Sequence, residues 1–230
     1  MVQVNAQTRE VSLKVVYYGP ALSGKTTNLQ ALFQRIDAGA RGRLMTLDTK
    51  DDRTLFFDML PVTLRGHSGV TVKLKLYSVP GQVMHESTRR LVLQGTDAVV
   101  FVADSRRSEA QSTAASWAEM LQNLRANGVD PDDVPIVVQM NKRDLPDARG
   151  PDEFQDLPGA ESATFVPAVA VRNEGVVETF HVLLSLTFRR LDRLIGIGQT
   201  CQIGEDQFLG DIFSRVDVAG TSVRAAEGVR

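Results

Sequence analysis

The chain has 230 residues, of which 43% are hydrophobic and 23% are charged, and its formal net charge is -2. This length and composition are typical of one globular domain with additions, and the near-neutral charge gives no general attraction for nucleic acid or an anionic membrane. The single cysteine, Cys201, excludes an internal disulfide and a multi-cysteine zinc site.

The first strong pattern is a strand, a glycine-rich loop and a helix. Residues 10–18 alternate and end in an apolar run, as a central strand does. Residues 19–26 read GPALSGKT, with the spacing G-x-x-x-x-G-K-[ST], and a helix is expected from there to about Ile36. In such a loop, backbone N–H groups and the helix dipole bind phosphate, while Lys25 reaches the outer phosphates and Thr26 binds Mg²⁺. The pattern predicts a nucleoside triphosphate site.

Strands and helices then alternate to residue 195. Further strands are expected at 44–47, 55–64, 70–77, 98–103, 135–140 and 164–166. Further helices are expected at 83–94, 109–126 and 174–195. This alternation predicts an α/β fold with a mostly parallel central sheet, helices on both faces, and ligand loops at the carboxyl ends of the strands.

The segment 196–230 has a weaker pattern, because glycines interrupt it and only residues 208–213 offer an apolar face. The sequence favours a partly disordered terminus here. The alternative is a segment that docks on a partner or on the domain's own surface.

A second motif, N-K-x-D, follows the expected strand at 135–140. The Asp144 carboxylate can accept hydrogen bonds from N1–H and the N2 amino group of guanine, which adenine does not offer. Asn141 is expected to tether neighbouring loops, and Lys142 to lie along the base. Together with the phosphate loop, this motif makes GTP the expected nucleotide.

With both motifs in place, the chain resembles a Ras-superfamily small GTPase, and more closely the bacterial MglA family that controls cell polarity and gliding motility. The resemblance is carried by the runs 16–20, 52–58, 79–83 and 141–146. It implies a P-loop small G domain over residues 8–195, followed by a C-terminal extension over 196–230. It also implies a GTP-binding molecular switch that hydrolyses GTP to GDP with Mg²⁺.

The resemblance also implies catalytic roles. Gln82 would orient the attacking water, and Arg53 would act as an arginine finger from the same chain. Thr54 would approach Mg²⁺ and the γ-phosphate in the GTP state, and the Gly81 N–H would bind the same phosphate. Ser78 would hold Mg²⁺ through a water molecule.

The nucleotide contacts implied by the resemblance lie in the phosphate loop, the switch segments, N-K-x-D and a last base-binding loop. In that last loop the backbone N–H of Ala170 would contact guanine O6, although the usual serine and lysine neighbours are missing. The nucleotide-binding residues are Gly19, Ala21, Leu22, Ser23, Gly24, Lys25, Thr26, Thr27, Thr54, Gly81, Asn141, Lys142, Asp144, Val169, Ala170 and Val171. The metal-binding residues are Thr26, Thr54 and Ser78.

Two departures from the family pattern bear on activity. Ser78 stands where most small GTPases have aspartate, which predicts a weaker electrostatic hold on Mg²⁺. Ala21 stands where glycine is usual, and its methyl group would crowd Gln82, which predicts slow hydrolysis. The alternative function is therefore a pseudo-GTPase that acts as a GTP-loaded scaffold. A kinase or ATPase is disfavoured by Asp144.

The resemblance implies an activating roadblock-domain partner similar to MglB, and effectors that bind the GTP state. The first residues lack the basic and apolar blocks of a signal peptide, and no apolar run approaches the length of a membrane span. We therefore expect a cytoplasmic protein, recruited to a cell pole or the inner membrane surface only through partners.

Overall fold

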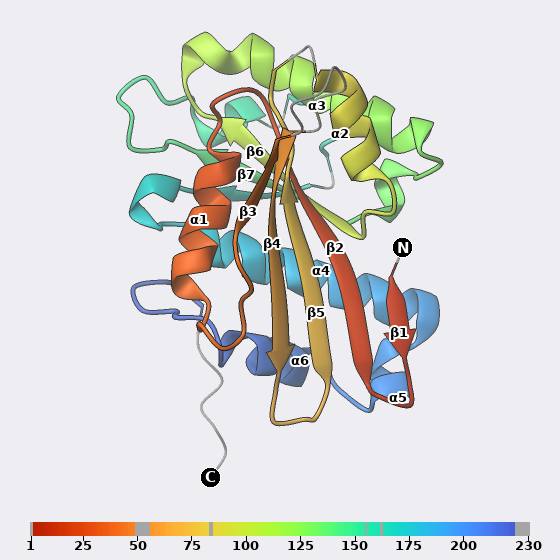
Figure 1. Ribbon diagram of the computed structural model, residues 1–230. Coiled ribbons are helices and arrows are strands. Elements are labelled where there is room, and N and C mark those ends of the chain that lie inside the picture. Colours follow the sequence, from red (N-terminus) through yellow and green to blue (C-terminus); the bar gives the residue numbers. More distant parts are fainter. Residues whose placement is uncertain (1, 49–55, 83–84, 155, 162, 224–230) are drawn as a thin grey trace.

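A central sheet with helices on both faces organises the chain (Figure 1). The computed structural model describes residues 2–48, 56–82, 85–154, 156–161 and 163–223. The strands of this part are β1 (Gln3–Asn5), β2 (Glu10–Tyr18), β3 (Met45–Asp48), β4 (Phe56–Arg65), β5 (Thr71–Ser78), β6 (Ala98–Asp104), β7 (Ile136–Asn141) and β8 (Thr164–Pro167). Its helices are α1 (Lys25–Arg35), α2 (Glu86–Leu93), α3 (Ala110–Ala126), α4 (Val176–Ile195), α5 (Ile197–Cys201) and α6 (Glu205–Phe213).

The sheet has the order β3-β4-β5-β2-β6-β7-β8, and β1 pairs with the start of β2. Pairing is parallel from β5 through β2, β6 and β7 to β8, and antiparallel at β3, β4 and β1. The mostly parallel α/β sheet expected from the alternating pattern is confirmed. The parallel strands end at the same edge, so the loops after β2, β5, β7 and β8 share that edge.

Burial explains why the strand patterns differ. Every residue of β6 is buried, because helices cover both faces of this part of the sheet, and its sequence is accordingly almost all apolar. In β5 buried residues alternate with more exposed ones, which matches its strict apolar and polar alternation. Helices α1, α4 and α6 pack on one face, and α2 and α3 belong to the core of the other face. On this second face Trp117 meets Phe101 edge to face, with ring centroids 5.0 Å apart.

The described part of the C-terminal extension docks on the domain's own surface, which the sequence offered as the alternative to a partly disordered terminus. Over residues 196–223 it folds as α5, α6 and a following turn segment. The apolar side chains of α6 lie buried in the main core, where Phe208 packs on Phe188 and Phe213 packs on Phe180 with ring centroids 5.1 Å and 5.9 Å apart. Gly196 and Gly204 precede the two short helices, whereas Gly198 and Gly210 lie within them.

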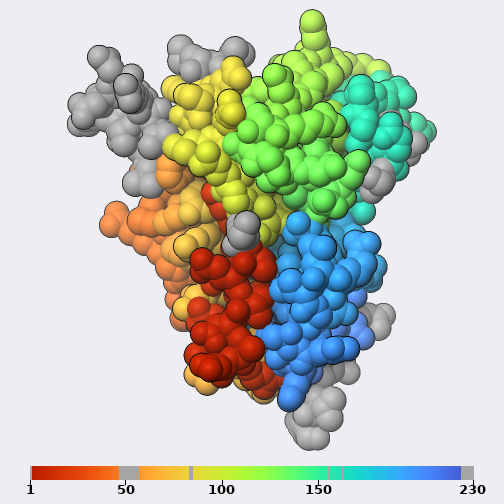
Figure 2. Space-filling model, turned by 90° about the vertical axis from the view of Figure 1, so that its right-hand side faces the viewer, coloured from red at the N-terminus to blue at the C-terminus, as the bar shows by residue number. Residues whose placement is uncertain are grey.

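Polar contacts also fix the extension to the end of the sheet away from the carboxyl edge. The Asp211 carboxylate accepts hydrogen bonds from the backbone N–H of His67 (2.9 Å) and Ser68 (3.2 Å) in the β4–β5 turn. The Arg9 guanidinium, just before β2, donates to the Cys201 carbonyl (3.0 Å). Figure 2 shows the red N-terminal part of the chain lying against the blue C-terminal part.

The remaining differences from the expected elements are small. The strand β1 was not predicted, and the last long helix begins at Val176 instead of residue 174. In the described part of the chain, no helix combines the length and the apolar character needed to cross a membrane.

Candidate nucleotide-binding site

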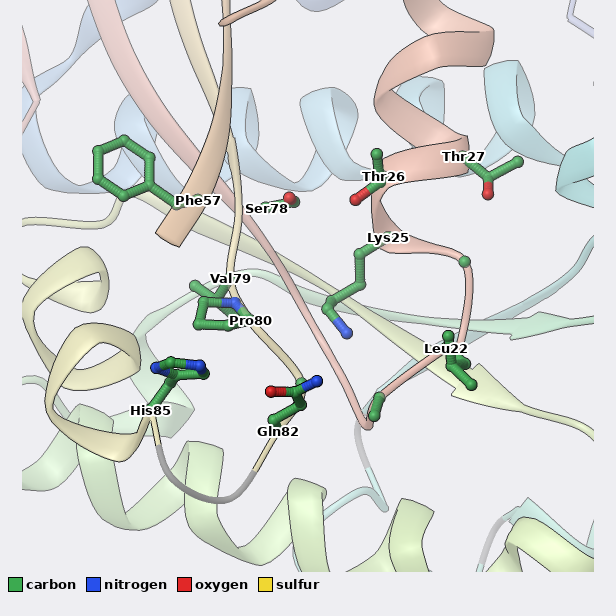
Figure 3. A pocket seen from close by; sticks show the side chains of 13 residues that line it. Leu22, Lys25, Thr26, Thr27, Phe57, Ser78, Val79, Pro80, Gln82 and His85 are labelled. Carbon is green, nitrogen blue, oxygen red and sulfur yellow. The ribbon is translucent and has the colours of Figure 1, made fainter. Parts of the chain in front are cut away.

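A cleft of about 590 Å³ opens where β2 and β5 end (Figure 3). This volume lies in the range of small-molecule sites, about 300–1,000 Å³. Its lining includes much of the predicted phosphate site, together with four residues that the sequence did not single out for a role. The lining residues are Ala21, Leu22, Gly24, Lys25, Thr26, Thr27, Phe57, Ser78, Val79, Pro80, Gly81, Gln82 and His85.

Two glycines give the loop between β2 and α1 its shape. Gly19 and Gly24 have φ angles of 145° and 105°, which side chains rarely adopt. A Cβ at Gly19 would lie 2.3 Å from the Val102 carbonyl oxygen, and one at Gly24 would lie 2.3 Å from Nδ2 of Asn141. Close packing therefore requires glycine at both positions of the motif, independently of the predicted phosphate binding.

Lys25 begins α1, and its side chain extends into the cleft (Figure 3). The residue is 7% exposed, and its Nζ donates to the carbonyl oxygens of Gly19 (2.9 Å) and Pro20 (2.6 Å). Burial lowers the pKa of this ammonium group to about 7, and the nearby Arg89 charge adds to the effect. A buried cation at a helix N-terminus suits an anionic ligand, which would restore the favourable environment of the charged form.

A buried carboxylate that the sequence reasoning missed joins two of the predicted metal-binding residues. Asp58 on β4 accepts hydrogen bonds at Oδ2 from the hydroxyls of Thr26 (2.6 Å) and Ser78 (2.7 Å), and at Oδ1 from Thr46 (2.8 Å). Hydroxyl and carboxylate oxygens are the ligands that Mg²⁺ prefers. The residues present at this point therefore fit the ion.

The loop after β5 packs directly on the phosphate loop. A Cβ at Gly81 would lie 2.4 Å from both N and Cα of Ala21, so only glycine fits there. Arg89 of α2, which is buried, donates to the backbone carbonyl of Gln82 and, from Nε, to the Glu119 carboxylate on α3 (2.8 Å). The loop that carries Gln82 is thus anchored to two helices.

Asn141, at the end of β7, joins the phosphate loop to the loop after β8, which is predicted to bind the base. Its Nδ2 donates to the Ser23 carbonyl (2.7 Å), and its Oδ1 accepts from the Ala170 N–H (2.9 Å). This is the tether expected for Asn141, although contact with a nucleotide stays a prediction. The neighbouring Lys142 donates from Nζ to the buried Asp104 (2.6 Å).

The other predicted base-binding residues are not among those that line the cleft. Asp144 follows β7, and its carboxylate lies 3.5 Å from the Arg172 guanidinium. In the loop after β8, Val169 and Ala170 are buried and Val171 is 76% exposed. The predicted Arg53 and Thr54 lie outside the described residues.

Comparison with known proteins places this geometry in a family. The model of the ADP-ribosylation factor family matches residues 1–186. The chain belongs to this family of small GTPases. It is a GTP-binding protein that hydrolyses GTP. The phosphate loop and N-K-x-D predicted the binding, and the family resemblance implied the hydrolysis.

Two relatives show how far this small GTPase resembles individual proteins. It is 40% identical over 190 residues to the mutual gliding-motility protein MglA of Myxococcus xanthus, covering 83% of this chain and 97% of MglA. It is 25% identical over 128 residues to the Ras-related protein Rab-5B of Plasmodium falciparum, covering 56% of this chain and 59% of that protein.

The comparisons confirm the MglA-like resemblance and give no support to the alternative of a GTP-loaded scaffold. The family match ends at residue 186, so α5 and α6 lie beyond it. Asp58, Asp104 and Arg89 are three charged side chains at the site that sequence reasoning missed. Each acts through contacts between elements far apart in the chain, which no local motif records.

Proposed function

We propose that this small GTPase is a GTP/GDP switch whose nucleotide lies with its phosphates on the loop 19–26 and its base on the loops after β7 and β8. The observation that carries the proposal is the Asn141 tether, which joins all three segments through bonds of 2.7 Å and 2.9 Å. The buried Lys25 at one end and Asp144 at the other then bind opposite ends of one ligand.

Phosphoryl transfer needs positioning and charge stabilisation more than covalent chemistry. In the proposed mechanism Gln82 orients the attacking water, and the Gly81 N–H binds the γ-phosphate. The close packing of Gly81 on Ala21 supports this assignment, because it holds the loop after β5 against the phosphate loop. Arg53 would neutralise developing charge, and Thr54 would meet the γ-phosphate.

Thr26, Thr54 and, through water, Ser78 would hold Mg²⁺, which when bound neutralises charge on the β- and γ-phosphates. Ser78 by itself supplies no negative charge. We propose that Asp58 supplies it instead, because its carboxylate oxygen lies 2.7 Å from the Ser78 hydroxyl and 2.6 Å from that of Thr26.

Guanine recognition is assigned to Asp144 for N1–H and the amino group, and to the Ala170 N–H for O6. Lys142 lies along the base, with Val169 and Val171 flanking Ala170. The Lys142 ammonium is bonded to Asp104, which supports this role because it fixes the course of the side chain. The remaining contacts of the phosphate loop fall to Leu22, Ser23, Gly24 and Thr27 with their neighbours.

The similarity to MglA supports a cellular role in motility or polarity, since that relative is named for gliding motility. We propose a roadblock-domain protein similar to MglB as the activating partner, and effectors that bind the GTP state. The G domain would span residues 8–195, with 196–230 as its extension. Residence in the cytoplasm, with recruitment to a pole or the inner membrane surface through partners, completes the proposal.

The test is mass identification of the nucleotide that copurifies with the full chain, compared with Lys25→Ala. We expect GDP or GTP in the wild type and none in the variant, because Lys25 is the cation placed for the outer phosphates. An adenine nucleotide in the wild type, or retained nucleotide in Lys25→Ala, would contradict the proposal.

A further inference from the structure

Two amide side chains face each other in the core directly behind the site. Asn28 on α1 and Gln139 on β7 are both fully buried. Asn28 Nδ2 donates to Gln139 Oε1, and Gln139 Nε2 donates back to Asn28 Oδ1, each at 2.8 Å. Burying two amides is costly unless they are hydrogen-bonded, so this pair strongly favours one relative position of the helix and the strand.

The hydrogen bonds continue from the pair in both directions. Asn28 Nδ2 also donates to the Gly24 carbonyl (3.0 Å), and Gln139 Nε2 also donates to the hydroxyl of Thr179, a fully buried residue on α4 (2.9 Å). That hydroxyl in turn donates to the Gly175 carbonyl (2.5 Å). Both amides therefore use both of their N–H donors.

The two ends of this network lie at the loops that would hold a nucleotide. Gly24 is the last residue of the phosphate loop before α1, and Gly175 is the residue before α4, next to the last base-binding loop. Gln139 and Asn141 are two apart on β7, so both side chains lie on the same face of the strand. Asn141 joins the phosphate loop, β7 and the loop between β8 and α4. The Asn28–Gln139–Thr179 network joins the same three segments, from a position two residues earlier on β7.

Core stability alone does not require polar side chains here. Replacing all partners of a buried network by apolar groups of similar shape is often nearly neutral for stability. What a satisfied network adds is a fixed geometry, because its bonds are directional.

We propose that Asn28, Gln139 and Thr179 are positioning residues that hold the phosphate loop and the base loops at the separation that one guanine nucleotide requires. This inference rests on the proposed function. Without the network the loops would still form, but they would sample other separations and release the nucleotide faster.

The test compares GDP release from the full-length chain with its thermal stability, using fluorescently labelled GDP. In the triple variant Asn28→Leu, Gln139→Met, Thr179→Val, we expect near wild-type thermal unfolding but release faster by about tenfold or more. This is the size of effect that hydrogen-bond partners one layer behind a bound group have in metal sites.

Single variants of α4 keep the test decisive if the triple variant does not fold. Thr179→Val should release GDP faster than wild type, whereas Thr179→Ser should restore the wild-type rate because it keeps the hydroxyl. Thr187→Val is the matched control. Thr187 is buried on the same helix and makes the same kind of hydroxyl bond, to the Leu183 carbonyl (2.6 Å), away from the loops.

Equal release rates in wild type, Thr179→Val and a folded triple variant would overturn the inference while leaving the proposed function intact. Equal acceleration by Thr187→Val would also overturn it, because the effect would then be general loss of helix stability. A wild-type chain that fails to bind GDP would refute the proposed function, and this inference with it.

Discussion

Phe213 provides a quantitative test of how the C-terminal extension contributes to the fold. It is 1% exposed, and its ring centroid lies 5.9 Å from that of Phe180 and 5.0 Å from that of His181. Phe213→Ala removes the buried ring and leaves a cavity between α6 and α4. Substitutions of this kind cost about 3–5 kcal/mol. For a chain of this size each kcal/mol lowers the melting temperature by about 2–4 °C, so we expect a decrease of about 6–20 °C.

The assay is thermal and urea unfolding of the full chain, followed by circular dichroism. Leu194→Ala is the control, because Leu194 lies at the end of α4 and is 63% exposed, and such surface changes stay within about 0.5 kcal/mol. If Phe213→Ala were as stable as Leu194→Ala, α6 would not be part of the core, and the extension would be the loosely attached tail that the sequence favoured.

Three further predictions concern the site. Asp144→Asn should weaken GDP and GTP binding together by about 1.5–3 kcal/mol, which is the value of a hydrogen bond to a charged group. Unchanged GDP affinity, measured by calorimetry, would refute the assigned guanine contact. Because Lys25 has a pKa of about 7 and bound phosphate would raise it, GDP binding should take up a proton above pH 7, and affinity should fall by up to about tenfold per pH unit. Titration calorimetry in buffers of different ionisation enthalpy measures this uptake, and heats that are the same in all buffers would contradict it. If Asp58 supplies the charge that Ser78 lacks, Asp58→Asn should raise the Mg²⁺ concentration needed to slow GDP release by about tenfold. Thr46→Val is the control, because it removes only the hydrogen bond to the other carboxylate oxygen of Asp58.

The fold and the two nucleotide motifs were predictable because their signals are local. The apolar run of β6 reflects burial on both faces, and the alternation of β5 reflects burial on one. The phosphate loop and N-K-x-D each place their chemistry within eight residues or fewer, so their spacing carries the information.

The features that the sequence did not reveal depend on contacts between distant segments. Asp58 lies in an ordinary alternating strand, and only the sheet brings it to Thr26 and Ser78. The Asn28–Gln139 pair joins residues 111 positions apart, and each amide alone reads as an unremarkable polar residue. The extension was interpreted as a tail because its helices are short and glycines lie between and within them, whereas its stability comes from packing on α4.

The packing of Gly81 on Ala21 bears on the slow GTP hydrolysis that the sequence predicts from Ala21. Ala21, Gly81 and Gln82 all line the cleft, and the backbone of Gly81 already packs tightly on Ala21. A methyl group at position 21 therefore lies among the groups that we propose to position water and the γ-phosphate. We expect Ala21→Gly to hydrolyse GTP faster than the wild type, with unchanged GDP affinity.

Single-turnover hydrolysis tests most directly whether this small GTPase turns over GTP with its own residues. Wild type, Gln82→Ala and Ala21→Gly would be loaded with GTP, and phosphate release followed with and without a roadblock-domain partner. We expect Gln82→Ala to lower the rate on the order of a hundredfold or more without a matching loss of nucleotide affinity, the mark of an interaction made mainly in the transition state. Wild-type hydrolysis no faster than that of Gln82→Ala, even with the partner present, would contradict it.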